Sequence, residues 1–150
     1  MSSKMMPHIR VVGVGSYGCY AVSEKAKAGI PGTNNIRFIA ADSDKEVLGQ
    51  IAADAKIIIE EKLINSLSMK IDIEACREMP DESIDGLEEA LSGADVVIIV
   101  AGMGGKTGTL AAPLIARRSK EKDILTLGVI TEPFRHEGET SASRAGFGQY

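Results

Sequence analysis

Short runs of aliphatic residues alternate along the chain with longer segments rich in helix-forming residues. Each run is too short for a free-standing helix, so the pattern predicts strands. The runs lie at 8–14, 36–41, 56–59, 94–101 and 123–131. The fourth run, ADVVIIVA, is apolar on both faces, which is typical of a central strand in a sheet that helices cover on each side.

The segments between these runs predict helices. They lie at 19–28, 45–52, 82–91 and 109–122, while residues 60–80 show no readable pattern. Asp44 and Asp81 stand where an N-cap would be, and Gly29 and Gly93 stand where the first and third of these helices should end. Pro113 falls near the expected first turn of the last helix, where its missing N–H has little effect.

At least four strand-to-helix steps follow one another, which predicts an α/β fold. We expect a doubly wound, mostly parallel sheet of at least five strands with helices on both faces. A length of 150 residues suits a single domain over 1–150, with mobile ends expected at 1–7 and about 139–150. Ligands of such sheets bind beyond the carboxyl ends of the strands.

Charge and composition narrow the classes of partner. The net charge is −4 and the basic residues are spread along the chain, so we expect no nucleic-acid partner. No apolar run approaches the roughly 20 residues of a membrane span, and the first residues, MSSKMMPHIR, lack the apolar stretch of a secretion signal. We therefore expect no membrane partner and a cytoplasmic protein. Two distant cysteines, Cys19 and Cys76, and two histidines indicate neither a disulfide framework nor a metal site.

Two glycine-rich turns follow strands at the edge where a ligand should bind. The first, GVGSYG at 13–18, fits the dinucleotide fingerprint GxGxxG, with Asp42 placed as a ribose-binding acid. Its glycines could also serve only close packing of strand and helix. The second, AGMGGKTGT at 101–109, contains the GKT of a Walker A loop but has Val100 where that motif requires glycine. Such turns bring backbone N–H groups and a helix N-terminus to an anion, most often a phosphate.

The second turn carries a family resemblance. AGMGGKTGTLAAP resembles the tubulin/FtsZ signature in its bacterial form, AGMGGGTGTGAAP, with Lys106 and Leu110 replacing two glycines. Further segments are similar to FtsZ in the same order. They are RVVGVGSYGCYAV, FIAADSD, GADVVIIVAGMGG and LTLGVITEPFRHEG, so that the resemblance covers most of residues 9–138.

The resemblance implies a site for GTP or GDP, with Mg²⁺ as a further candidate ligand. Gly102, Met103, Gly104, Gly105, Lys106, Thr107, Gly108 and Thr109 would wrap the phosphates, and Gly15, Ser16, Tyr17 and Gly18 would support them. Asp44 would lie near the phosphates and any magnesium, and Glu137 would contact the ribose. Tyr20 replaces the asparagine that approaches guanine in the family, and its ring could stack on a purine.

The segments of FtsZ that read guanine and complete hydrolysis have no counterpart before Tyr150. We therefore expect a guanine-nucleotide-binding domain that acts as a nucleotide-responsive regulator or assembly module, with weak or no hydrolysis alone and self-association or another FtsZ-like chain as partner. One alternative is a GTPase or ATPase completed at an oligomer interface. Others are a Rossmann-type dinucleotide binder and a degenerate protein-interaction scaffold.

Overall fold

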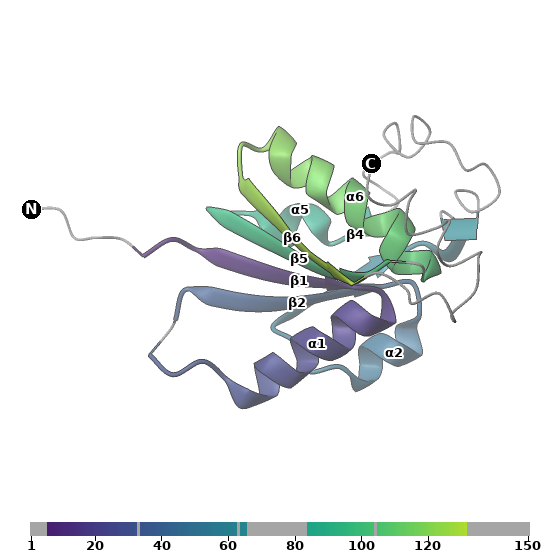
Figure 1. Cartoon of the computed structure of the whole chain (residues 1–150), viewed down its shortest axis with the longest axis horizontal. Coiled ribbons are helices and arrows are strands. Elements are labelled where there is room, and N and C mark those ends of the chain that lie inside the picture. The colour runs from purple at the N-terminus through teal and green to yellow at the C-terminus, as the bar shows by residue number, and fades with distance from the viewer. Residues whose placement is uncertain (1–5, 33, 63, 66–83, 104, 132–150) are drawn as a thin grey trace, which may run out of the picture.

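The computed structural model describes residues 6–32, 34–62, 64–65, 84–103 and 105–131. One sheet runs through this part of the chain, with helices on either side of it (Figure 1). The strands are β1 Ile9–Val14, β2 Ile36–Asp42, β3 Ala55–Ile59, β4 Ile84–Asp85, β5 Val96–Gly102 and β6 Leu125–Thr131. The helices are α1 Gly15–Ala28, α2 Lys45–Gln50, α5 Leu87–Leu91 and α6 Lys106–Glu121.

The strand order is β4-β3-β2-β1-β5-β6. All neighbours are parallel except β4, which pairs antiparallel with the end of β3 through two residues. The predicted doubly wound, mostly parallel sheet of at least five strands is therefore confirmed. The central placement of the 94–101 run is also confirmed, since β5 lies between β1 and β6.

Helices cover both faces of the sheet, as predicted. Figure 1 shows α1 and α2 on one side and α5 and α6 on the other. Alternate strand residues point into the two layers: Ile39 and Ala41 join the larger apolar cluster with α5 and α6, whereas Ala40 packs with Cys19 and Leu48. This alternation follows from the two-residue repeat of a strand, and it explains why the inner strands are aliphatic throughout.

Two helices begin earlier than the sequence predicts. Helix α1 begins at Gly15 rather than at 19, and α6 begins at Lys106 rather than at 109. Each follows its strand almost directly, so residues that look like loop by composition form the first helical turn. Pro113 consequently lies in the interior of α6 and not near its first turn.

The expected helix over 82–91 is confirmed at Leu87–Leu91 and wrong at 84–86. Ile84 pairs with Ile59 to form β4, and Gly86, at φ 89°, separates this short strand from α5. A left-handed residue interrupts a right-handed helix, so within the described residues 84–91 the helix begins at Leu87 and ends at Leu91. Asp81, the expected N-cap, lies outside the described residues. Helix α2 also ends two residues earlier than expected, at Gln50.

The carboxyl ends of the parallel strands meet at one edge of the sheet. Val14 is in register with Ala41 of β2 and Ala101 of β5, and Gly102 is in register with Thr131 of β6. The segments that follow β1, β2 and β5 therefore leave the sheet side by side. Within the described residues, none of the helices has the length and apolar character needed to cross a membrane.

Candidate functional site

The two glycine-rich turns touch each other at this edge. Gly15 has φ +77°, a conformation that L side chains rarely adopt, and a Cβ placed on it would lie 3.0 Å from the backbone N of Gly108. A Cβ on Gly108 would in turn lie 2.8 Å from the carbonyl oxygen of Gly102. The first turn of α1 thus packs against the first turn of α6 with no room for a side chain between them.

Two glycines of the GVGSYG turn serve the packing of α1 on the sheet. A Cβ on Gly13 would lie 2.1 Å from the Gly18 carbonyl oxygen, and a Cβ on Gly18 would lie 2.2 Å from the Val100 carbonyl oxygen. Both contacts are to backbone, which has little freedom to shift. The packing interpretation of this motif therefore holds for Gly13 and Gly18, whereas Gly15 faces the second turn.

The N-terminus of α6 is open to an anion. Its N-cap is Gly105, which provides no side-chain cap, and the first turn contains no acidic residue. The first N–H groups of a helix lack partners within the helix, and the helix dipole makes this end positive. Lys106, the first helical residue, adds an exposed ammonium group.

The turn after β2 is tied to this helix end. The Ser43 hydroxyl lies 3.4 Å from the Thr107 hydroxyl. One carboxylate oxygen of Asp42 accepts the Asp44 N–H at 3.0 Å. Asp44 caps α2, as predicted, because its Oδ1 accepts the N–H groups of Glu46 at 2.9 Å and Val47 at 3.4 Å. These bonds set the path of the chain from β2 into α2.

Asp42 is a buried acid with spare hydrogen-bonding capacity. The residue is 4% exposed, and its second oxygen, Oδ2, is buried without a hydrogen-bond partner among the described residues. A buried carboxylate oxygen normally has a partner, so this atom has an unused acceptor position of the kind that a donor or a cation fills. Its negative charge adds to the effect of burial in raising the pKa of the nearby Cys19 thiol to about 12.

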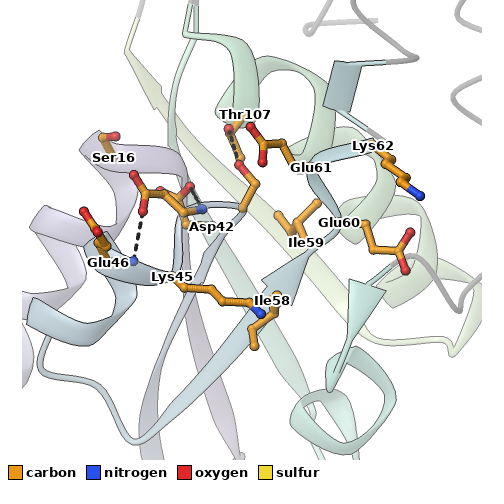
Figure 2. Close-up of a pocket in the computed structure, with 12 residues that line it drawn as sticks. Ser16, Asp42, Lys45, Glu46, Ile58, Ile59, Glu60, Glu61, Lys62 and Thr107 are labelled. Atoms are coloured by element: carbon orange, nitrogen blue, oxygen red, sulfur yellow. Dashed lines mark hydrogen bonds between the residues drawn. The ribbon is translucent and has the colours of Figure 1, made fainter.

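A cavity of about 990 Å³ lies beside these groups (Figure 2). Figure 2 shows its lining side chains, with the contact between Ser43 and Thr107 as a dashed line. The lining contains five acids and two lysines, so it is negative overall. The lining residues are Ser16, Asp42, Ser43, Asp44, Lys45, Glu46, Ile58, Ile59, Glu60, Glu61, Lys62 and Thr107. No cluster of three or more potential metal-ligating side chains occurs in the described part of the chain.

The structure brings together four of the predicted site residues in this cavity: Ser16, Asp44 and Thr107 of the nucleotide site, and Asp42, the acid expected with the dinucleotide fingerprint. Tyr17 and Tyr20 lie on α1 with 53% and 67% of their surface exposed. The Tyr17 ring is close to Gly102, since a Cβ on that glycine would lie 3.4 Å from Cγ of the ring.

Other predicted positions contribute no accessible side chain or cannot be placed. Met103 and Thr109 are buried, so only their main chain could contact a ligand. Gly104 and Glu137 lie outside the described residues.

Sequence reasoning missed part of this edge. Ser43, Glu60 and Glu61 line the cavity, and Asn65 accepts a hydrogen bond from Lys106 at 2.6 Å. Ser43 had a usable signal, because it lies between Asp42 and Asp44 in the turn after a predicted strand. The stretch from 60 has no readable pattern, so only the fold could place Asn65 beside the second glycine-rich turn.

Comparison with known proteins identifies the family to which this chain is similar. Residues 8–149 match the sequence model described as "Tubulin/FtsZ family, GTPase domain". An FtsZ from M. jannaschii, solved as an empty dimer, is 33% identical to this chain with a TM-score of 0.79. The match covers 98% of this chain and 42% of that FtsZ chain.

More distant structures share the fold. CetZ from Methanosaeta thermophila is 17% identical with a TM-score of 0.69, over 96% of this chain and 42% of the other. TubZ of Clostridium botulinum phage c-st is 19% identical with a TM-score of 0.67, over 96% of this chain and 46% of the other. The chain thus spans less than half the length of these structures.

Proposed function

This chain belongs to the tubulin/FtsZ family through its GTPase domain, and from that premise we propose that it binds GTP or GDP at the carboxyl edge of its sheet. The observation that carries the proposal is the contact between Gly15 and Gly108, which joins both glycine-rich turns at the uncapped N-terminus of α6. The proposal further takes residues 1–150 as a single nucleotide-binding domain.

The phosphates would lie against the two turns. In this proposal Gly102–Thr109 wraps them through backbone N–H groups, and Gly15–Gly18 supports them from α1. The positive end of the α6 dipole and the Lys106 ammonium group supply the attraction for an anion. Thr107, whose hydroxyl is within reach of Ser43, would stand at the mouth of the cavity.

The acidic cavity supports magnesium as a companion of the nucleotide. Asp42 and Asp44 place carboxylates beside Thr107, where they would repel a bare polyphosphate. Mg²⁺ prefers oxygen ligands and is usually held by one or two carboxylates together with substrate phosphates. The buried Oδ2 of Asp42, which has no hydrogen-bond partner in the described part of the chain, and the carboxylate of Asp44 fit such an ion. When bound, it would neutralise phosphate charge.

The base and ribose contacts rest on the family resemblance. Tyr20 is exposed on α1 and its ring offers a stacking surface for guanine. Tyr17 lies next to Gly102 and would border the same site. Glu137 remains the proposed ribose contact. The family assignment favours guanine nucleotide over the dinucleotide suggested by the GVGSYG fingerprint.

We further assign this domain a regulatory or assembly role with weak or no hydrolysis alone, in the cytoplasm. A dimeric FtsZ among the similar structures supports self-association, or pairing with another FtsZ-like chain, as the form of that assembly. Hydrolysis that rises more steeply than linearly with protein concentration would instead indicate an active site completed between chains.

The first experiment is to denature the purified protein and identify any released nucleotide by chromatography and mass. Melting curves with GTP, GDP, ATP and NAD, each with and without Mg²⁺, would accompany it. Ligand at a hundred times its dissociation constant stabilises the folded form by about 2.7 kcal/mol. We expect GTP and GDP to raise the Tm of the protein, and we expect ATP and NAD to leave it unchanged. No shift with either guanine nucleotide, with none released, would contradict the proposal.

Gly105→Ala tests the location of the site. A Cβ at Gly105 would lie 3.8 Å from the nearest heavy atom, the carbonyl oxygen of Gly102, so the variant should fold normally. It should bind GDP at least about tenfold more weakly, because the methyl group enters the proposed phosphate cradle. Gly49→Ala, which adds the same methyl group to α2 with nothing within 4 Å, is the matched control. Equal affinities would place the phosphates elsewhere.

A further inference from the structure

Lys106 makes a long-range contact that the proposed phosphate site does not explain. Its Nζ donates a 2.6 Å hydrogen bond to Oδ1 of Asn65, 41 residues earlier in the chain. Both side chains are exposed. Among the described residues Lys106 forms no ion pair. Its ammonium group is instead hydrogen-bonded to a neutral amide oxygen.

The place of Lys106 makes this partner informative. It is the first residue of a 16-residue helix whose first turn contains no acid. A cation at the positive end of a helix dipole is unfavourable, whereas an anion there is stabilised. An ammonium–phosphate hydrogen bond, with both partners charged, is stronger than one to an amide oxygen. A phosphate at this helix end would therefore compete with Asn65 for Lys106.

Asn65 is held in position by its neighbour. Ile64 is 2% exposed and belongs to the main apolar cluster, and its N–H donates to the Glu60 carbonyl oxygen at 3.3 Å. The backbone is thus anchored one residue before Asn65. On the same helix turn, Thr107 contacts Ser43. The start of α6 is consequently linked to the segment after β2 and to the segment after β3.

We propose that Asn65 holds Lys106 in the nucleotide-free protein and that a nucleotide phosphate takes its place. On binding, Nζ would exchange Oδ1 of Asn65 for a phosphate oxygen, and the link between α6 and the segment after β3 would be released. This inference rests on the proposed function. It makes Asn65 a positioning residue that lowers affinity for phosphorylated ligands and couples phosphate binding to the contact between these two segments.

The test measures the affinities of GTP, GDP and guanosine by calorimetry for wild type, Asn65→Ala, Asn65→Asp and Lys106→Gln. Asn65→Ala should bind GTP and GDP about twofold to fivefold more tightly, since exposed charged contacts have this strength. Asn65→Asp should bind them about fivefold more weakly, because it holds Lys106 as an ion pair and repels phosphate. Guanosine should bind all variants equally. Asn34→Ala, also exposed, is the control.

The combined variant Asn65→Ala/Lys106→Gln decides whether the effect passes through Lys106. With no ammonium to release, removal of Asn65 should leave the affinity of Lys106→Gln unchanged. If Asn65→Ala binds GDP like wild type, or improves binding equally in the Lys106→Gln background, the inference is overturned while guanine-nucleotide binding stands. A wild type that binds neither GTP nor GDP removes the proposed function and this inference together.

Discussion

Single atoms decide which glycines this fold requires. Gly18 has the Val100 carbonyl oxygen where its Cβ would be, so the distance between α1 and the sheet depends on the missing side chain. Gly105, in the other turn, has space for a methyl group. The same residue type therefore serves close packing at one position and an open approach at the other.

Gly18→Ala should lower the free energy of unfolding by at least about 2 kcal/mol, because the added Cβ would meet backbone at 2.2 Å and overpacking at a rigid contact has this cost. Urea denaturation measures the change. Gly49→Ala serves as the control and should leave stability unchanged or raise it by up to about 1 kcal/mol, since it lies in a helix with open space around it. Equal midpoints for the two variants would contradict the packing described for Gly18.

The Cys19 thiol should be unreactive in the folded protein. Burial, the charge of Asp42 and a pKa of about 12 leave very little thiolate at pH 8. In a Cys76→Ser background, a disulfide reagent should react with Cys19 on the order of a thousandfold more slowly in the folded than in the unfolded chain. Similar rates in both states would show that the thiol is not protected.

The same thiol gives a pH dependence. Because its pKa is raised by folding, the folded state retains the proton, and the stability that Cys19 contributes is fully present below the pKa of the unfolded thiol. That contribution is lost as pH rises toward about 12. Cys19→Ala should therefore show a shallower loss of stability above pH 9. An unchanged alkaline slope would contradict the shift.

The ends of the helices differ in how their N–H groups are satisfied. Helix α2 has six residues and is capped by Asp44, while α6 has sixteen residues and its N-cap residue, Gly105, provides no side-chain cap. A short helix depends on its cap, because nucleation is unfavourable and few bonds follow it. The long helix tolerates an open N-terminus, which leaves that end available to a ligand.

Asp44→Ala should lower the free energy of unfolding by about 1 kcal/mol through loss of the α2 cap. Asp44→Asn keeps an oxygen acceptor at this position and should retain most of the stability. Thermal unfolding of both variants without ligand separates the cap from any role of the charge. A drop of the same size in Asp44→Asn would mean that the charge, not the cap, stabilises this turn.

Across the whole molecule, the edge strand β6 is more exposed than the inner strands of the sheet. Leu125, Leu127 and Val129 share one face and are 59%, 49% and 54% exposed, whereas Ile99 on the neighbouring β5 is buried. Helix α1 covers the middle of the sheet and leaves this end uncovered in the described structure (Figure 1).

Leu127→Ala should therefore lower the free energy of unfolding by less than about 1 kcal/mol, while Ile99→Ala should lower it by about 2–5 kcal/mol because it opens a cavity in the core. Both remove aliphatic carbons from adjacent strands of one sheet, and the two side chains lie on opposite faces that differ in burial. Denaturant titration provides the two values. A cost at Leu127 as large as that at Ile99 would show that another surface covers β6 in solution.

Local sequence patterns are enough to predict the sheet and the edge where a ligand would bind. Aliphatic runs of strand length and the segments between them predict parallel strands, and parallel strands bring their carboxyl ends together whatever the details of packing. The AGMGGKTGT turn also sufficed for the family, which the comparison confirms. Asp44 was found as a cap because capping is a local interaction.

Other features depend on contacts between segments that are distant in the sequence, and these were visible only in the folded chain. The approach of Gly15 to Gly108, the link from Lys106 to Asn65 and the pairing of Ile84 with Ile59 join residues that no local pattern connects. The early start of α6 also depends on the fold, because glycine composition indicates a loop while packing against β5 and α1 makes the same residues helical. Periodicity reports which side of an element is buried, but the partner that buries it is set by the three-dimensional arrangement.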